Sequence, residues 1–343
     1  MTFVYEPYTI NLMSKKNIAI VAGGDSSEYV VSVKSGANVL QAIDQELFTP
    51  WLVRIKGEEW IILDGENRLA EIDKSDFSFT LADQKYKFDY AYIIIHGTPG
   101  EDGILQGYFE MLRIPYSTCG VQSSALTFNK YFCNNYLRSF GIPMANSVRL
   151  IAGERYSAAL IVESLGLPLF VKPSAGGSSF GVTKVKKEED LVEAVNKALD
   201  ESPEVIVEQF IDGSEFTCGV VKIGERKLVF PVTEVIPKNE FFDYESKYIP
   251  GMASEITPAR ISEKLTLDIQ KRSAEIYDLC SCKGIVRVDF ILRGDTFYFL
   301  EVNTVPGMTE TSFIPQQIKA MGLSMTDLLT EIILDGLDNG PEK

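Results

Sequence analysis

The sequence predicts an α/β domain built on a parallel sheet, followed by two α+β domains. Its length of 343 residues suits two or three domains, and 45% hydrophobic with 24% charged residues is ordinary globular usage. Strand and helix patterns alternate near the start of the chain, which is typical of a parallel sheet with crossover helices. Strand patterns near the end follow one another closely, which is typical of α+β domains.

The first domain begins with an apolar strand pattern over 18–22, followed by a helical pattern over 31–43. A second strand pattern over 90–95 ends at His96. In parallel sheets, the loops at the carboxyl ends of strands carry the functional site. We therefore expect the loops over 23–28 and 96–103 to contribute to it.

The later part of the chain has the pattern of α+β domains. We expect helices over 124–140, 191–199 and 262–282, and strands over 169–172, 205–208, 216–221 and 228–235. A polar and aromatic loop over 237–250 has the length and composition of a lid. These patterns predict an N-terminal extension and three domains, with the following bounds: 1–16, 17–122, 123–213 and 214–343.

Composition excludes several classes of function. A net charge of −15 disfavours a nucleic-acid binder, and the chain has no long uncharged apolar run that could span a membrane. The one histidine, His96, excludes a multi-histidine metal site and leaves oxygen ligands for a hard cation. The five cysteines form no CxxC pair, and the start of the chain has no signal-peptide pattern, so we expect reduced, buried thiols in a cytoplasmic protein.

Two strand patterns over 284–291 and 297–303 carry the strongest chemical signal. Side chains alternate along a strand, so Arg287 and Asp289 share one face of the first strand, and Glu301 and Asn303 share one face of the second. Carboxylate and amide oxygens suit Mg²⁺, which keeps water and phosphate oxygens as its other ligands. The alternative interpretation is the solvated face of an edge hairpin.

The loop between these strands decides which residues face each other. A three-residue loop sets Asp289 opposite Glu301 and Arg287 opposite Asn303, whereas a two-residue loop sets Asp289 opposite Leu300. Two carboxylates directly opposite each other repel unless a cation lies between them.

Two further segments have the composition of a nucleotide site. The segment 172–181 places a lysine, Lys172, before glycines and serines whose N–H and hydroxyl groups can bind phosphate, although a plain turn is an equal alternative. The strand ending at Glu208 can present backbone groups to an adenine edge, with Glu215 placed for ribose hydroxyls, although a plain strand and turn is the favoured interpretation of this segment taken alone. The turn at Gly23 and Gly24 lacks the GxGxxG pattern, so a dinucleotide-binding oxidoreductase is disfavoured.

Taken in order, these segments resemble the ATP-grasp ligases, and among them the D-alanine–D-alanine ligase family. The resemblance covers about residues 17 to 335, and its most specific parts are HGTPGEDGILQG (96–107), FVKPSAGGSSFGV (170–182), VEQFIDGSEF (207–216), DYESKY (243–248) and RVDFI…FLEVNTVPGMTETS (287–312). It implies three domains that enclose ATP, and ligation of two D-alanines through an acyl phosphate for peptidoglycan precursor synthesis. It also implies a homodimer formed through the first domain.

The resemblance implies a role for each matching residue. ATP would be bound by Lys130, Lys172, Ser178, Ser179, Glu208, Glu215 and Lys247. Two Mg²⁺ ions, or Mn²⁺ in their place, would be bound by Asp289, Glu301 and Asn303. The D-alanines and the reaction's oxyanion would be bound by Glu28, His96, Lys247, Arg287, Gly307, Ser312 and Phe313. Hydrogen bonds between Glu28, Ser178 and Tyr248 would close the lid.

Other functions remain as alternatives. Another ATP-grasp ligase could use D-serine or D-lactate as acceptor, although Tyr248, where D-lactate-adding relatives tend to have histidine, favours an amine. Phe313 stands where leucine is common and leaves the size of the acceptor pocket open. A non-catalytic nucleotide sensor is disfavoured, because such a protein should have lost Arg287 or a metal ligand.

Overall fold

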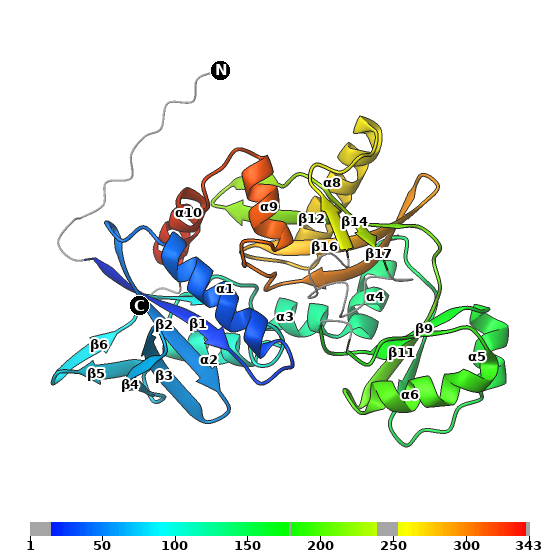
Figure 1. Ribbon diagram of the computed structural model, residues 1–343, viewed down its shortest axis with the longest axis horizontal. Helices are drawn as coiled ribbons and strands as arrows, with labels where there is room; N and C mark the ends of the chain where they lie inside the picture. The colour runs from blue at the N-terminus through cyan, green and yellow to red at the C-terminus, as the bar shows by residue number, and fades with distance from the viewer. Residues whose placement is uncertain (1–14, 178–179, 239–252, 341–343) are drawn as a thin grey trace.

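The protein is described by a computed structural model that covers residues 15–177, 180–238 and 253–340. Three sheets follow one another along the chain, and each belongs to a different part of the molecule (Figure 1). Most of the predicted N-terminal extension and of the predicted lid loop lie outside the described residues.

The first sheet has seven strands in the order β6-β5-β4-β3-β2-β1-β7. Its elements are β1 (Lys16–Gly23), α1 (Tyr29–Ala42), β2 (Phe48–Lys56), β3 (Glu59–Asp64), β4 (Asn67–Asp73), β5 (Ser78–Leu81), β6 (Gln84–Lys87), β7 (Tyr90–Ile93) and α2 (Ile104–Leu112). The predicted parallel pairing holds for β1 with β2 and with β7. The sheet is nevertheless mixed, because β3 to β6 add antiparallel strands through tight turns. Gly57 and Gly65 occupy the left-handed region at two of these turns, with φ of +52° and +58°.

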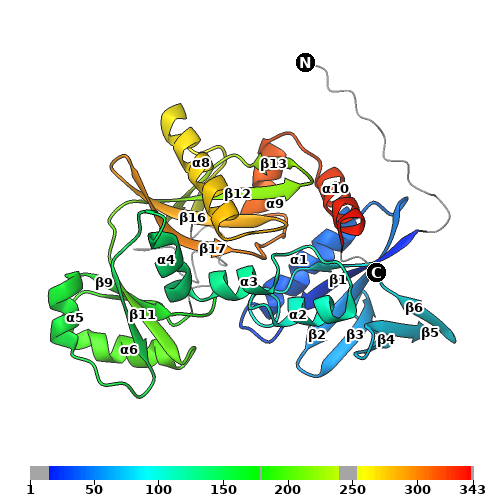
Figure 2. The ribbon, with the colours of Figure 1, turned by 180° about the vertical axis from the view of Figure 1, so that it is seen from behind.

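Two short helices, α3 (Val121–Phe128) and α4 (Lys130–Arg138), stand where the sequence predicts one helix over 124–140. The break falls at Asn129, whose extended backbone (φ −88°, ψ 106°) ends α3, and whose side chain accepts a hydrogen bond from the N–H of Phe132. The break orients α4 so that Lys130 lies at its first turn. Both helices run between the first and second sheets (Figure 2).

The second sheet is antiparallel, with the order β10-β9-β11-β8. Its elements are β8 (Ser147–Ile151), α5 (Ala158–Leu165), β9 (Leu169–Pro173), β10 (Thr183–Val185), a 3₁₀ turn (Glu188–Asp190), α6 (Leu191–Leu199) and β11 (Glu204–Gln209). The predicted helix over 191–199 is confirmed. The apolar side chains of α5 and α6 pack on the sheet and form a hydrophobic core separate from the others.

The third sheet is also antiparallel, with the order β15-β14-β12-β16-β17 and β13 paired to β12. Its elements are β12 (Ser214–Ile223), β13 (Arg226–Val229), β14 (Thr233–Pro237), β15 (Ala253–Ile256), α8 (Glu263–Leu279), β16 (Val286–Arg293), β17 (Thr296–Asn303), α9 (Phe313–Ala320) and α10 (Met325–Asp338). The last helix lies beside α1, and Leu329 and Ile333 share a core with Ile18 and Tyr92 of the first sheet (Figure 1). The first and third sheets are therefore joined by continuous apolar packing.

Candidate active site

The hairpin of β16 and β17 carries the centre of the site, and its register explains why. The turn between the strands has two residues, since Arg293 pairs with Thr296. A shift of register between Asp289 and Phe290 then restores the pairing of Asp289 with Glu301 and of Arg287 with Asn303. The connecting loop therefore has two residues, yet Asp289 faces Glu301, as we expected for a three-residue loop. The reason is a β-bulge, which adds one residue to β17.

The carboxylate of Asp289 is buried and fully engaged. Arg287 donates to both of its oxygens, Nε to Oδ1 at 2.9 Å and a terminal nitrogen to Oδ2 at 2.8 Å. The Thr217 hydroxyl donates at 2.5 Å, and the Asn303 amide nitrogen donates at 3.0 Å. Burial lowers the pKa of Arg287, but the charge and hydrogen bonds of Asp289 outweigh this effect and keep the pKa above its ordinary value.

Two cavities meet at this hairpin. One encloses about 330 Å³ between the first and third sheets, and the other encloses about 470 Å³ between the second and third. The residues that line both cavities are Lys130, Gly176, Gly177, Arg287 and Glu301. Each predicted site residue that the structure describes lines one cavity or both.

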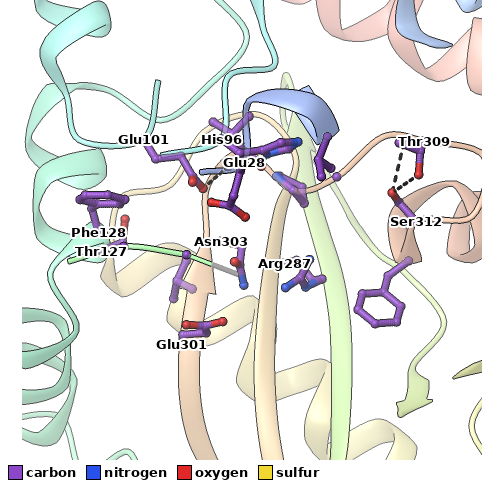
Figure 3. A pocket seen from close by; sticks show the side chains of 18 of the residues that line it. Glu28, His96, Glu101, Thr127, Phe128, Arg287, Glu301, Asn303, Thr309 and Ser312 are labelled. Carbon is purple, nitrogen blue, oxygen red and sulfur yellow. Dashed lines mark hydrogen bonds between the residues drawn. The ribbon is translucent and has the colours of Figure 1, made fainter. Parts of the chain in front are cut away.

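The first cavity collects residues from distant parts of the chain. Glu28 precedes α1, His96 follows β7, and Arg287 and Asn303 come from the hairpin; all four point into the same space (Figure 3). The other predicted residues of this cavity lie near the start of α9. Ser312 directly precedes this helix, and the Phe313 ring lies 5.2 Å from the Arg287 guanidinium carbon.

The turn before α9 completes this end of the cavity. The Ser312 hydroxyl accepts a hydrogen bond from the N–H of Thr309 at 3.1 Å and lies 2.7 Å from the Thr309 hydroxyl oxygen. A Cβ atom at Gly307 would lie 2.8 Å from Ser312 Oγ, so only glycine fits there without displacing that hydroxyl.

The carboxylate of Glu28 lies against the glycine-rich loop that follows β9 of the second sheet. A Cβ atom at Gly177 would lie 2.1 Å from Glu28 Oε2 and 3.0 Å from Oε1. The loop can approach Glu28 this closely because residue 177 has no side chain. Ser178, its predicted hydrogen-bond partner, follows directly in the chain.

If Glu28 binds a substrate, as the sequence analysis predicts, Gly177→Ala should lower kcat/KM for that substrate by about 10²-fold, because an ångström-scale displacement of a binding group costs that much. The added methyl group displaces the Glu28 carboxylate, which can swing aside, so the free energy of unfolding should change little. Steady-state kinetics and urea unfolding measure the two effects. Gly107→Ala is the matched control, since its Cβ would only meet Val121 at 3.7 Å. Equal kinetics for both variants would contradict the prediction.

The second cavity holds the residues predicted for the nucleotide. Lys172 and Glu208 form a buried ion pair at 2.5 Å, and Asn134 donates to the other Glu208 oxygen at 3.0 Å. Lys130 donates to the carbonyl of Gly176 at 2.7 Å and lies 3.5 Å from Glu301. Glu215 also lines this cavity. Apolar and aromatic side chains complete its walls, among them Phe170, Phe180, Val182, Ile211, Ile291, Tyr298 and Leu300.

Four predicted site residues lie outside the described part of the chain: Ser178, Ser179, Lys247 and Tyr248. Their predicted roles stay predictions.

The structure adds two carboxyl groups that the sequence analysis did not assign. Glu101 lines the first cavity and accepts hydrogen bonds from the N–H groups of Gly97 at 2.7 Å and Val305 at 3.2 Å. Glu255 lines it from β15 and accepts from Gln316 at 2.6 Å. Burial raises the pKa of Glu255. Glu101 falls in the segment 96–103 that the sequence singled out, but nothing in the sequence places it against Val305.

Stability should depend on pH through Glu101. Burial, followed by the charge of Glu28, raises the pKa of Glu101 from 4.5 to about 8. Between these values the folded chain keeps a proton that the unfolded chain has lost, so the free energy of unfolding falls as the pH rises. In Glu101→Gln the free energy of unfolding should not fall through this effect. The free energy of unfolding of the variant, relative to that of the parent, should therefore increase from pH 4.5 to about 8. Parallel profiles in urea unfolding would contradict this.

The metal-ligand prediction can be tested against the donor set. Asp289, Glu301 and Asn303 offer hard oxygen ligands on one face of the hairpin, which suits Mg²⁺. Within the described ranges, no group of three or more His, Cys, Asp or Glu side chains could hold a metal ion by itself. The residues therefore fit a magnesium site that phosphate oxygens and water complete, and binding there must exchange some of the present hydrogen bonds of Asp289.

Two remaining expectations concern the chain as a whole. All five cysteines are free and buried, as predicted. In the part of the chain that the structure describes, no helix has the length and apolar character needed to cross a membrane.

The family models that match this chain and a curated relative of it carry the same description. The family model described as "D-ala D-ala ligase N-terminus" matches residues 17–119, and "D-ala D-ala ligase C-terminus" matches residues 136–334. The D-alanine–D-alanine ligase of Bacteroides fragilis is 52% identical over 320 residues, covering 93% of this chain and 98% of that protein.

Solved structures share the fold over nearly the whole chain. The D-alanyl-alanine synthetase A of Vibrio cholerae superposes with a TM-score of 0.86 at 28% identity, covering 95% of this chain and 100% of that one. The VanG D-Ala:D-Ser ligase of Enterococcus faecalis superposes with a TM-score of 0.83 at 33% identity, covering 94% and 100%.

Proposed function

The chain belongs to the D-alanine–D-alanine ligase family, and we propose that its two adjoining cavities hold D-alanine and ATP on either side of one reaction centre. The protein is an ATP-dependent ligase that forms D-alanyl-D-alanine for peptidoglycan precursor synthesis. The observation that carries the proposal is the wall shared by the two cavities, which Lys130, Arg287 and Glu301 line from both sides.

The chemistry requires such a shared wall. A carboxylate oxygen of the first D-alanine attacks the γ-phosphorus of ATP, the bond to ADP breaks, and an acyl phosphate forms. The amine of the second D-alanine, having lost a proton, then attacks the carbonyl carbon. The tetrahedral intermediate collapses to the dipeptide as phosphate leaves with one oxygen of the donor carboxylate.

We assign ATP to the second cavity. Lys130 and Lys172 hold the α- and β-phosphates, Glu208 accepts from the adenine amine, and Glu215 binds the ribose. The apolar walls around these residues support an adenine site, since nucleobases bind between apolar side chains. Ser178, Ser179 and Lys247 contact the phosphates when the lid closes.

Asp289, Glu301 and Asn303 would hold two Mg²⁺ ions, or Mn²⁺. The ions, when bound, offset the negative charge of the transferring phosphoryl group. The contribution of the chain is to hold these ligands in place. Thr217 and Arg287 fix the orientation of the Asp289 carboxylate, and the bulge in β17 brings Glu301 opposite it.

The amino acids bind in the first cavity. Glu28 pairs with the ammonium of the first D-alanine, whose carboxylate lies near His96. Ser312 holds the carboxylate of the second D-alanine beside Phe313. Arg287 and the N–H of Gly307 stabilise the oxyanion, because charge in an enclosed site is neutralised by donors that are already in position. Hydrogen bonds that join Glu28, Ser178 and Tyr248 close the lid over the site.

We also propose the organisation in which the enzyme works. Its domains span 17–122, 123–213 and 214–343, and it forms a homodimer through the first domain. A boundary at 213 is supported by its position between β11 and β12, which belong to different sheets. The buried free cysteines support a cytoplasmic location.

Phosphate release tests the substrates. We expect release when the protein is mixed with ATP, Mg²⁺ and D-alanine, loss of release when a chelator removes Mg²⁺, and D-alanyl-D-alanine as the product by mass spectrometry. L-alanine is the matched control. D-serine or D-lactate, added with D-alanine, should give little mixed product. No release with D-alanine, or a preference for a mixed product, would overturn the substrate assignment.

A further inference from the structure

The turn that carries Gly307 is held by side chains of the first sheet's domain. Both backbone polar groups of Val305, two residues before Gly307, have side-chain partners. The N–H donates to Glu101 Oε1 at 3.2 Å, and the carbonyl oxygen lies 2.7 Å from Nδ1 of His96. Figure 3 shows His96 and Glu101 in the same part of the cavity as Glu28.

Met308, on the other side of Gly307, is bound in the same manner. Its N–H donates to the Ser35 hydroxyl at 3.2 Å, and its carbonyl accepts from the Asn38 amide at 2.6 Å. Both of these side chains come from α1. Four bonds from one domain therefore fix the backbone on either side of Gly307.

The His96 ring joins the two halves of this clamp. A carbonyl oxygen only accepts, so its contact at 2.7 Å requires a proton on Nδ1. The other ring nitrogen, Nε2, lies 3.5 Å from the Ser35 hydroxyl, which already accepts from Met308 and so has its proton available for donation. The bonds then run in one direction, from the Met308 N–H through Ser35 and His96 to the Val305 carbonyl.

The surroundings keep the ring neutral. His96 is 5% exposed and Ser35 is fully buried. Burial lowers the pKa of His96 and the charge of Arg287 lowers it further, whereas the charge of Glu28 and the Val305 carbonyl act in the opposite direction. Neutral His96 with its proton on Nδ1 offers no N–H to a substrate carboxylate, since Nε2 is then an acceptor.

We infer that His96, together with Ser35 and Glu101, is a positioning residue that holds the turn from Val305 to Met308 so that the Gly307 N–H faces the reacting carbonyl. This rests on the proposed function for the role of that N–H. The ring acts through the backbone of Val305 and not by contact with the substrate. The clamp also couples the first domain, which binds the donor ammonium through Glu28, to the oxyanion site on the third.

Three substitutions of His96 separate a positioning role from substrate binding. The amide nitrogen of asparagine can replace Nδ1, whereas that of glutamine can replace Nε2. We expect His96→Asn to retain kcat within about 10-fold of the parent, and His96→Gln and His96→Ala to lose about 10²-fold, as for removal of one oxyanion donor. KM for D-alanine should change little in all three. Recovery by glutamine but not asparagine, or a loss confined to KM, would overturn the inference.

The tautomer can be observed without any variant or activity. His96 is the only histidine of the chain, so ¹⁵N-histidine labelling of the protein, without added histidines, gives the signals of this one ring. We expect a protonated Nδ1 and an unprotonated Nε2 at neutral pH, both alone and with ADP and Mg²⁺. A protonated Nε2 would overturn the inference. Loss of ligase activity in the parent would instead refute the proposed function and leave this spectrum as an independent test.

Discussion

Replacing Arg287 by alanine is expected to lower kcat by about 10²- to 10³-fold, the usual cost of removing a donor from an oxyanion site. Arg287 lines both cavities, which we assign to the phosphoryl donor and to the amino acids. ATP binding, which we assign to Lys130 and Lys172, should stay near that of the parent. Rapid-mix kinetics and nucleotide titration measure the two effects separately.

The variant has a structural cost that must be measured beside its kinetics. Without Arg287, the buried Asp289 carboxylate keeps Thr217 and Asn303 as its side-chain partners among the residues that the structure describes, so we expect a lower free energy of unfolding. Arg287→Lys keeps the charge without the two-pronged contact and should fall between parent and alanine. Arg226→Ala, which breaks an exposed ion pair on the third sheet, is the matched control. Near-parent turnover in a folded Arg287→Ala protein would remove the proposed role.

Glu301→Gln is expected to lower kcat by about 10²-fold and to raise the Mg²⁺ concentration needed for half-maximal activity by about 10- to 100-fold, the range found when groups supporting a metal site are removed. The substitution keeps the shape of the side chain but removes the charge that faces Asp289 across the hairpin. Activity measured over a Mg²⁺ titration gives both values.

Two further variants test whether the change in Mg²⁺ dependence is specific to the proposed metal ligands. Asp289→Asn should shift the Mg²⁺ dependence in the same direction, because it removes the partner carboxylate. Glu331→Gln removes a carboxylate of α10 that pairs with Arg226, far from the cavities, and should leave the titration unchanged. An unchanged Mg²⁺ dependence in Glu301→Gln would contradict a metal-binding role for this residue.

The hairpin illustrates how much of the site could be predicted from sequence. Alternation along each strand placed Arg287 with Asp289, and Glu301 with Asn303, because side-chain direction in a strand depends only on residue parity. The register between the strands could not be predicted, because the bulge that realigns them depends on packing in the third sheet. The parallel pairing of β1 with β7 followed from local patterns in the same way, whereas β2 was not among the predicted strands.

Contacts between distant segments were beyond sequence reasoning. The break at Asn129 depends on a capping bond that competes with a continuous helical pattern, and tertiary packing decides between them. Glu101 binds Val305 across 204 residues of chain, and His96 binds the same residue across 209. Such bonds require the packed positions of the first and third sheets, which no pattern within either segment contains.

The path of the carboxylate oxygen tests most directly whether the two cavities share one reaction centre. D-alanine labelled with ¹⁸O in its carboxylate can be turned over with unlabelled ATP, and the released phosphate analysed by mass spectrometry. If the donor carboxylate attacks the γ-phosphorus at the wall formed by Arg287 and Glu301, each phosphate carries one ¹⁸O atom. Phosphate without ¹⁸O, released together with dipeptide, would show that no acyl phosphate forms and would contradict the account.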